Sequence, residues 1–349
     1  MWLVRYSDTF SPIEIINNII NGIKDPAKAY FKNMEMNSKP QIMGSLITVT
    51  STLLIGFYYC GIPLGIYFFK KLSIHTKILV IIAIILEASV YIMKGTNIGL
   101  FRVGLSLIII LMLKWIQSKN NKPIKSRKEI AKKIICIMLL AILVISYFTY
   151  STTDRMDNII PEKISNMPVD TNNIMLYLIP NNFKYGFIMI DSYLTQGYCG
   201  MSNALGYDFQ TTFGIGNSAF LIENFQDVFN INIYNRTYQN RIKDVWDDRI
   251  NWHTAYTWFA NDVSFIGIIP LMFILGFMLY KVVNSAKNGN IFAIILLPLY
   301  AQMILFLSAN NSVLSNPMTF MPFVLIHFMW FISYLQGNKY KLKEVNNEK

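Results

Sequence analysis

The 349-residue sequence has little charge and few residues of the kinds that bind metals or form disulfides. Only 15% of its residues are Asp, Glu, Lys or Arg, whereas 53% are apolar or aromatic, and the mean hydropathy is +0.37. This balance favours an integral membrane protein over a soluble protein with a single core. Three cysteines and three histidines, with no metal-ligand spacing among them, predict neither a disulfide framework nor a metal site.

Two common local patterns are also missing. The glycine-rich stretch GIGNS at 214–218 is followed by neither G-x-G-x-x-G nor G-K-[ST], so it is not the fingerprint of a dinucleotide- or phosphate-binding loop. The N-terminal stretch MWLVRYSDTF lacks a basic segment followed by an apolar one, so no cleavable signal peptide is expected. Insertion is then expected to depend on the membrane spans themselves.

The basic residues are concentrated outside one long segment. The chain has 31 Lys/Arg and 20 Asp/Glu, a formal charge of +11; residues 151–262 hold 7 of these bases and 12 of the acids, so 24 bases and 8 acids lie elsewhere. Most of the excess falls in short segments between apolar runs, where it sets membrane orientation and attracts anionic lipid. We interpret the basicity as a topology signal and expect no nucleic-acid partner.

Apolar runs long enough to cross a bilayer recur along the chain and predict an all-α polytopic membrane protein. Seven are found, near 45–69, 77–93, 98–116, 134–150, 263–283, 291–309 and 318–336. Segment 117–133 carries seven Lys/Arg and one Glu, which predicts a cytoplasmic loop. Alternation then places the long loop 151–262 outside the membrane and the basic tail 337–349 inside.

The predicted organisation has five parts. Residues 1–40 form an extracytoplasmic or interfacial segment, 41–150 hold four spans, 151–262 form the outer loop, 263–336 hold three spans, and 337–349 form the tail. Ser11, Pro12 and Glu14 predict a capped helix start. Isoleucines follow at helical spacing, which suits either a helix lying in the membrane interface or one packed against a partner.

Two ionisable residues, Glu87 and Arg102, fall inside predicted spans. Each lies about two turns or less from the outer turn at 94–97, roughly 8 to 10 Å deep at 1.5 Å per residue, so they can meet across the hairpin. They form either a structural ion pair or a site where Arg102 reaches a phosphate near the outer headgroups.

The outer loop holds the other candidates for chemistry. Arg236, Arg241 and Arg249 are candidate diphosphate ligands because the guanidinium fork binds phosphate oxygens in pairs. Acidic neighbours at 244, 247 and 248 can instead neutralise them as a solvated cluster. His253 is the only histidine of the loop and is either a structural side chain or a base. Tyrosines and phenylalanines between 193 and 213 suit either sugar stacking or the membrane interface.

Four segments between spans, in the order YLTQGYCGMSNAL, TTFGIGNSAF, WHTAYTWFANDVSFIG and SANNSVLSNP, resemble the Wzy-type polymerases of lipid-linked oligosaccharide repeat units. The resemblance covers about residues 85–335. His253, Tyr256 and Gly267 are also similar to the H-N-x-Y…G-x-x-G segment of the related O-antigen ligases. Thr254 and Ser264 stand where ligases usually have Asn and Gly, which favours the polymerase. Asn97 stands at the position of the arginine in the family's G-[ST]-R pattern, so the role of that arginine requires Lys94 or Arg102 in its place. The family generally has more spans, and an outward N-terminus with seven spans leads us to expect that N-terminal helices are missing from this chain.

The resemblance implies a bundle of the GT-C type in the bacterial cytoplasmic membrane, with an active loop outside. It implies transfer of a growing glycan from undecaprenyl diphosphate to a hydroxyl of the next repeat unit, without a metal or nucleotide sugar. A flippase and a chain-length regulator are expected neighbours. With that chemistry, cations must stabilise the leaving diphosphate and a base must receive the hydroxyl proton. The predicted base is His253, with Asp262 second; the predicted sugar-site residues are Gly197, Tyr198, Gly200, Asn217 and Tyr256. An O-antigen ligase, or a transporter of lipid-linked glycans, is the alternative.

Overall fold

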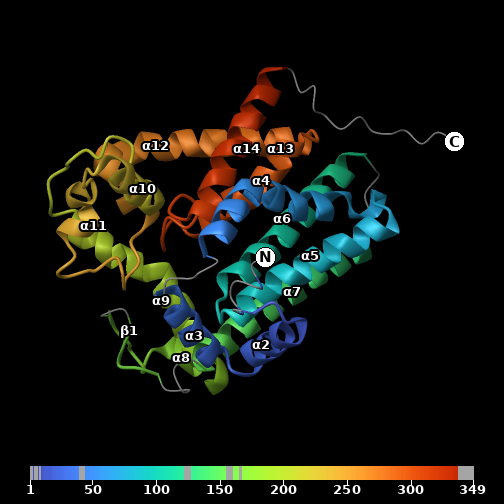
Figure 1. Cartoon of the computed structure of the whole chain (residues 1–349), viewed down its shortest axis with the longest axis horizontal. Coiled ribbons are helices and arrows are strands. Elements are labelled where there is room, and N and C mark those ends of the chain that lie inside the picture. Colours follow the sequence, from blue (N-terminus) through green and yellow to red (C-terminus); the bar gives the residue numbers. More distant parts are fainter. Residues whose placement is uncertain are drawn as a thin grey trace. The chain divides into compact units, whose positions relative to one another are not determined.

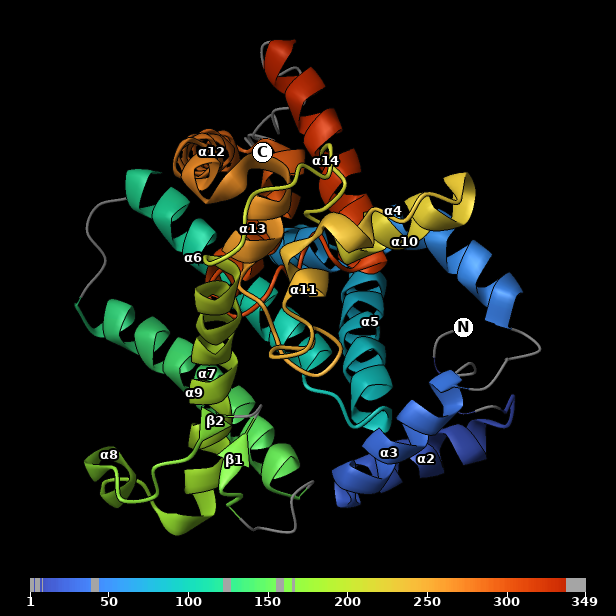
Figure 2. The same ribbon diagram turned by 90° about the vertical axis from the view of Figure 1, so that its left-hand side faces the viewer.

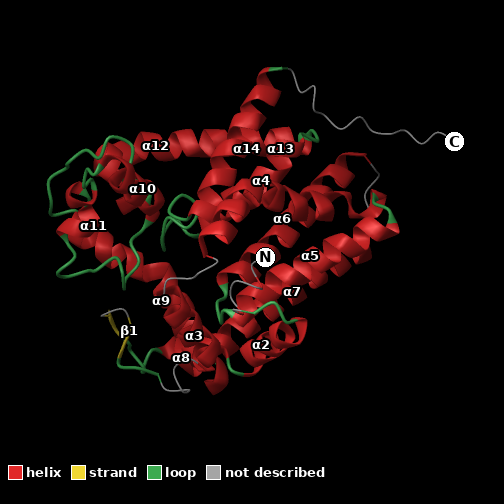
Figure 3. Ribbon diagram, in the orientation of Figure 1, coloured by secondary structure: helices red, strands yellow, loops and turns green. Residues whose placement is uncertain are grey.

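The computed structural model describes residues 3, 7, 9–38, 44–121, 127–154, 160–164 and 167–336. This part of the chain contains thirteen α-helices, two short 3-10 helices and one hairpin formed by β1, Lys163–Ile164, and β2, Met167–Pro168 (Figure 3). The all-α prediction is therefore confirmed. The chain divides into two compact units, Met1–Ile190 and Asp191–Lys349.

The first unit is built from packed apolar helices. Helices α4, α5 and α6 pack against one another, α7 packs against α6, and α2 and α3 both contact α5 (Figure 1). The elements are α2 (Pro12–Lys24), α3 (Pro26–Ser38), α4 (Gly44–Phe68), η1 (Phe69–Lys71), α5 (Ile74–Met93), α6 (Ile98–Asn121), α7 (Arg127–Asp154), α8 (Ile174–Tyr177) and the beginning of α9 (Asn181–Ala204).

The capped helix start predicted near residue 11 is present. The Ser11 hydroxyl accepts a hydrogen bond from the backbone N–H of Glu14 at 3.5 Å, and Pro12 occupies the first helical position of α2. Asp25 ends α2 and begins α3, because its carboxylate accepts the backbone N–H of Lys28 at 2.8 Å. The sequence therefore determines both boundaries locally.

The second unit places three apolar helices in sequence order, α12 against α13 and α13 against α14 (Figure 2). Helix α13 forms the centre of this packing, since Ile294 and Leu296 are completely buried. The other elements precede them along the chain. The bounds are α10 (Ala219–Phe229), η2 (Tyr234–Arg236), α11 (Tyr238–Arg241), α12 (Ala255–Lys287), α13 (Ile291–Leu305) and α14 (Pro317–Leu335).

A kink at Ser264 divides α12 into a short first segment and a long apolar second segment. Ser264 has φ 64° and ψ 168°, a backbone conformation that residues other than glycine rarely adopt. Its hydroxyl accepts the backbone N–H of Gly267 at 3.3 Å, as a helix N-cap does. The second segment thus begins where the predicted span 263–283 begins.

Among the described residues, four helices are long and apolar enough to cross a membrane: Ile74–Met93, Ile98–Ser118, Ala255–Lys287 and Pro317–Leu335. They coincide with four of the seven predicted spans. The predicted span 291–309 corresponds to α13, an apolar helix of 15 residues. The predicted span 45–69 covers α4 apart from its first residue and includes the first residue of η1, and the predicted span 134–150 falls within α7. The chain is thus a possible multi-pass membrane protein, while its orientation stays a prediction and the tail 337–349 lies outside the described residues.

Candidate functional site

The four segments that carry the family resemblance meet in the second unit around the first segment of α12. The loop at 211–217 and the first two residues of α11 are hydrogen-bonded to Asn261 and Asp262. The connection between α13 and α14 joins them, since Asn311 donates to the backbone carbonyl of Asn217. Residues far apart in the sequence therefore form one polar framework.

Asp262 is the centre of this framework. Its Oδ1 accepts hydrogen bonds from the Thr212 hydroxyl and from the backbone N–H groups of Gly214, at 2.9 Å, and Gly216, at 3.1 Å. Its Oδ2 accepts the backbone N–H of Asn217 at 3.0 Å and its side-chain amide at 2.8 Å. With five donors around two oxygens, the carboxylate is engaged in holding the loop. These hydrogen bonds give Asp262 a structural role in holding the loop. A base would not need them.

Asn261 fastens the neighbouring segments and was missed in the sequence. Its amide donates to the Gly216 carbonyl and to Gln239 Oε1, both at 2.8 Å, and its Oδ1 accepts the backbone N–H of Tyr238 at 2.9 Å. Asn261 is completely buried. An amide can serve donors and acceptors together, so this side chain satisfies backbone groups of two loops that no regular element pairs.

Gly197 and Gly200 form the contact face of α9. A Cβ at Gly197 would lie 2.6 Å from the carbonyl oxygen of Ser308 and 2.8 Å from the backbone nitrogen of Thr254. A Cβ at Gly200 would lie 2.7 Å from Trp246 and 2.9 Å from His253 Nδ1. These distances are shorter than real Cβ contacts, so both positions need glycine for close approach. The structure places the two predicted sugar-site glycines at a packing face.

His253 lies inside this packing. Its side chain is 1% exposed, and neither ring nitrogen has a well-aligned hydrogen-bond partner among the described residues. Burial lowers the pKa of His253 to about 4, although the nearby Trp246 backbone and Asp247 act in the opposite direction. The imidazole is therefore neutral at physiological pH, as a base must be, but it is not presented to solvent in this conformation.

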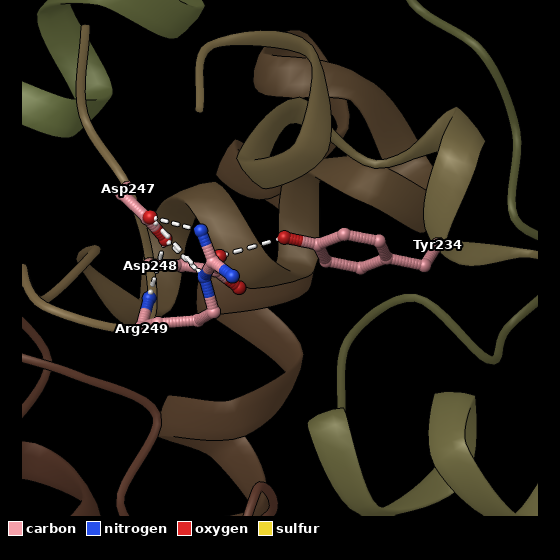
Figure 4. A network of polar contacts seen from close by, with 4 residues as sticks. All are labelled: Tyr234, Asp247, Asp248 and Arg249. Atoms are coloured by element: carbon pink, nitrogen blue, oxygen red, sulfur yellow. Dashed lines mark hydrogen bonds and ion pairs between the residues drawn. The ribbon is translucent and has the colours of Figure 1, made fainter. Parts of the chain in front are cut away.

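Arg249 is paired with an acidic neighbour, as expected if the loop arginines belong to a solvated charge cluster. Its Nε and Nη2 bind both oxygens of Asp247, with the shortest contact 2.6 Å, although 83% of the arginine side chain is exposed (Figure 4). The hydrogen bond from Arg249 lowers the pKa of Asp247 to about 2. Next to this pair, the Tyr234 hydroxyl donates to Asp248 at 2.6 Å. Arg249 is thus the least available of the three for a diphosphate.

Arg236 and Arg241 have different surroundings. Arg236 donates to the Thr211 carbonyl at 3.3 Å and lies over the Phe213 ring, 5.4 Å from its centroid. Arg241 donates to the Asp208 carbonyl and lies over the rings of Tyr207 and Tyr238, 5.1 and 5.6 Å from their centroids. Neither guanidinium forms an ion pair within the part of the chain that the structure describes. Their positive charge is therefore oriented by neutral groups, and no described carboxylate pairs with it.

The remaining predicted residues are divided between the units. Tyr198 is exposed on α9 and lies near Tyr256 on α12. Asn217 is occupied in the framework, since it also donates to the Gly214 carbonyl at 2.9 Å. Arg102 belongs to the first unit and donates to the hydroxyls of Tyr59, at 2.9 Å, and Tyr91, at 3.4 Å. Its predicted pairing with Glu87, which is buried, stays a prediction.

Comparisons of the chain with protein-family models, with curated proteins and with solved structures found no significant match. Function is therefore inferred from the residues and from their arrangement.

Proposed function

We propose that this chain is a membrane glycosyltransferase that polymerises undecaprenyl-diphosphate-linked oligosaccharide repeat units at the outer face of the bacterial cytoplasmic membrane. The product would be a surface polysaccharide. The observation that carries this proposal is the pair of exposed or half-buried arginines, Arg236 and Arg241, whose charge no described carboxylate neutralises. The apolar helix α12, which follows them closely in the chain, supports action on a lipid-linked substrate.

The reaction explains why such cations are needed. The bond between the anomeric carbon and the diphosphate oxygen breaks, the diphosphate leaves with the electron pair, and a hydroxyl oxygen of the acceptor sugar bonds to the carbon. The hydroxyl loses its proton to a base or to water. Negative charge therefore grows on the diphosphate in the transition state, where fixed cations stabilise it most. An arginine held over an aromatic ring and by a carbonyl is already oriented for this task.

The framework around Asp262 gives this pair a defined location. Phe213, under Arg236, belongs to the loop that Asp262 holds, and Tyr238, under Arg241, donates its backbone N–H to Asn261. Both arginines are thus attached through short connections to the start of α12. We propose that this rigidity keeps the cations in place before substrate arrives, which lowers the cost of binding and reaction.

Both candidate bases are more enclosed or more engaged than the two cations. His253 is neutral but buried, and Asp262 already accepts five hydrogen bonds. We propose that the arginines carry most of the rate enhancement. His253 stays the first candidate for the base if the contact with Gly200 opens when substrate binds.

The test compares Arg236 and Arg241, which have no described ion pair, with Arg249, which is paired with Asp247. The full chain is reconstituted in lipid nanodiscs with undecaprenyl-diphosphate-linked oligosaccharide from cells that lack this gene, and polymer ladders are resolved on gels. Arg241→Ala and Arg236→Ala should each reduce turnover by about 10² or more, the size typical for loss of one charge-stabilising donor. Arg249→Ala, with its exposed ion pair to Asp247, serves as the matched control and should stay within a few-fold of the wild type.

Two results would contradict the proposal. If the wild-type chain forms no ladder but transfers a single glycan to a lipid A core acceptor, it is an O-antigen ligase. If it moves the lipid-linked glycan across the bilayer without forming a glycosidic bond, it is a transporter. Equal losses for all three arginine variants would instead show that the wrong residues were selected.

A further inference from the structure

The first unit contains a cavity of about 230 Å³ formed by α2, α3 and the end of α5. Its walls combine amide and lysine side chains with the apolar residues Ala29 and Met93. The residues relevant here are Asn18, Lys24, Lys28, Lys32, Asn33 and Lys94. The cavity is smaller than the space of about 300 Å³ or more that holds most drug-sized ligands, so it suits a compact polar group.

The charge around this cavity is strongly positive. Lys28 and Lys32 lie one turn apart on α3, and Lys24 lies in the last turn of α2. None of these three lysines forms an ion pair among the residues that the structure describes. The one acid in the lining, Asp25, uses a carboxylate oxygen to cap α3 at the Lys28 N–H. The surroundings therefore favour an anion.

A buried amide provides a second, independent observation. Asn33 lines the cavity and is 8% exposed, yet its Oδ1 has no hydrogen-bond partner among the residues that the structure describes. A buried polar atom without a partner is costly, so native structures usually satisfy it with a ligand or water. The other polar atom of this side chain, the NH₂ group, is a hydrogen-bond donor and can bind an anion in the cavity.

The exposed face of α2 identifies the kind of anion. Ile13, Ile16, Ile20 and Ile23 are 72%, 55%, 41% and 49% exposed, and they recur at helical spacing. A row of this kind beside lysines is typical of a helix that lies at the boundary between headgroups and acyl chains. Gly22 holds α2 to the end of α5, because a Cβ there would lie only 2.4 Å from the Ile92 carbonyl oxygen. The lysine-lined cavity and the apolar row thus belong to one anchored helix pair.

We propose that this cavity binds the phosphate of an anionic membrane lipid, with the isoleucine row inserted beside it. A glycerophospholipid and a polyprenyl phosphate carry the same phosphate chemistry, and either can occupy the site. Lys24, Lys28 and Lys32 supply the charge, and Asn33 donates from the cavity wall. This binding does not depend on glycosyl transfer by the second unit.

The experiment measures binding of fluorescent short-chain phosphatidylglycerol to the full chain in neutral detergent, with phosphatidylcholine as the uncharged probe. The Lys28→Gln/Lys32→Gln variant is compared with Lys70→Gln/Lys71→Gln, which removes the same charge from exposed lysines after α4. The cavity variant should bind phosphatidylglycerol about 30-fold more weakly, equivalent to about 2 kcal/mol at about 1 kcal/mol per lysine. The control should change less than about threefold.

The sources are distinguished by competition. If undecaprenyl phosphate displaces the probe at a lower concentration than unlabelled phosphatidylglycerol does, the site is supported and assigned to the polyprenyl lipid. If phosphatidylglycerol displaces it at the lower concentration, the site is assigned to the glycerophospholipid. Displacement by inorganic phosphate alone, at an equal concentration, would overturn the lipid assignment. Equal weakening in the two double variants, or equal binding of phosphatidylcholine, would overturn the cavity itself.

Discussion

Replacement of Asp262 by Asn tests whether the carboxylate organises the fold around the start of α12. The substitution keeps size and shape but replaces one oxygen with an NH₂ group. Oδ1 receives three donors and Oδ2 receives two, both from Asn217, so the amide oxygen is expected to take the Oδ1 position. The new NH₂ group then faces two N–H donors from which it cannot accept hydrogen bonds.

The size of the effect follows from those two lost contacts. Hydrogen bonds to a charged group contribute about 1.5–3 kcal/mol each, and partial access of water to Asp262 reduces the loss to the lower part of that range. We therefore expect Asp262→Asn to lower the free energy of unfolding of the second unit by about 3 kcal/mol. The midpoint of thermal unfolding should fall by roughly 6–12 °C.

Thermal unfolding of the purified chain in detergent, followed by tryptophan fluorescence, measures this directly. Asp227→Asn makes the same chemical change at an exposed carboxylate on α10 and should leave the midpoint within about 1 °C. A midpoint for Asp262→Asn within about 2 °C of the wild type would refute the structural role. If turnover were lost at the same time, Asp262 would instead be acting as the base.

Two further predictions concern the packing around His253. Gly200→Ala should lower the free energy of unfolding by about 1–3 kcal/mol, because its Cβ would overlap Trp246 and His253. Gly206→Ala is the control and should be tolerated, since a Cβ there would meet nothing closer than 3.7 Å. Equal unfolding midpoints for the two variants would contradict the close contact at Gly200. Because burial lowers the pKa of His253 to about 4, below about 6.5 in the unfolded chain, the unfolded state binds the extra proton between these values. The contribution of buried, neutral His253 to the free energy of unfolding should therefore be fully present above about pH 6.5 and fall by up to about 3 kcal/mol as the pH decreases to about 4. His253→Gln should remove this part of the pH dependence. If the pH profile of this variant matched that of the wild type, His253 would not be buried in the folded protein.

Much of the fold was predictable because its determinants are local. Apolar runs of membrane length coincide with α5, α6, α12 and α14, since the need to satisfy every backbone group in lipid leaves helices as the available structure. The Ser11 cap and the break at Asp25 were also predictable, because capping depends on residues three positions apart. The length of α13 was not, because α13 ends at Leu305 although the apolar run continues.

The environment of each candidate site residue was decided by tertiary structure. The sequence alone determined that the chain is helical, apolar and basic outside residues 151–262, because composition and helical periodicity are carried by neighbours. It left three arginines equivalent, and only the folded loop pairs Arg249 with Asp247 while placing Arg236 and Arg241 over aromatic rings. Likewise, the bonds from the 212–217 loop to Asp262 join groups about 45 or more residues apart. Such contacts depend on how distant segments pack, a property that no short stretch of sequence contains.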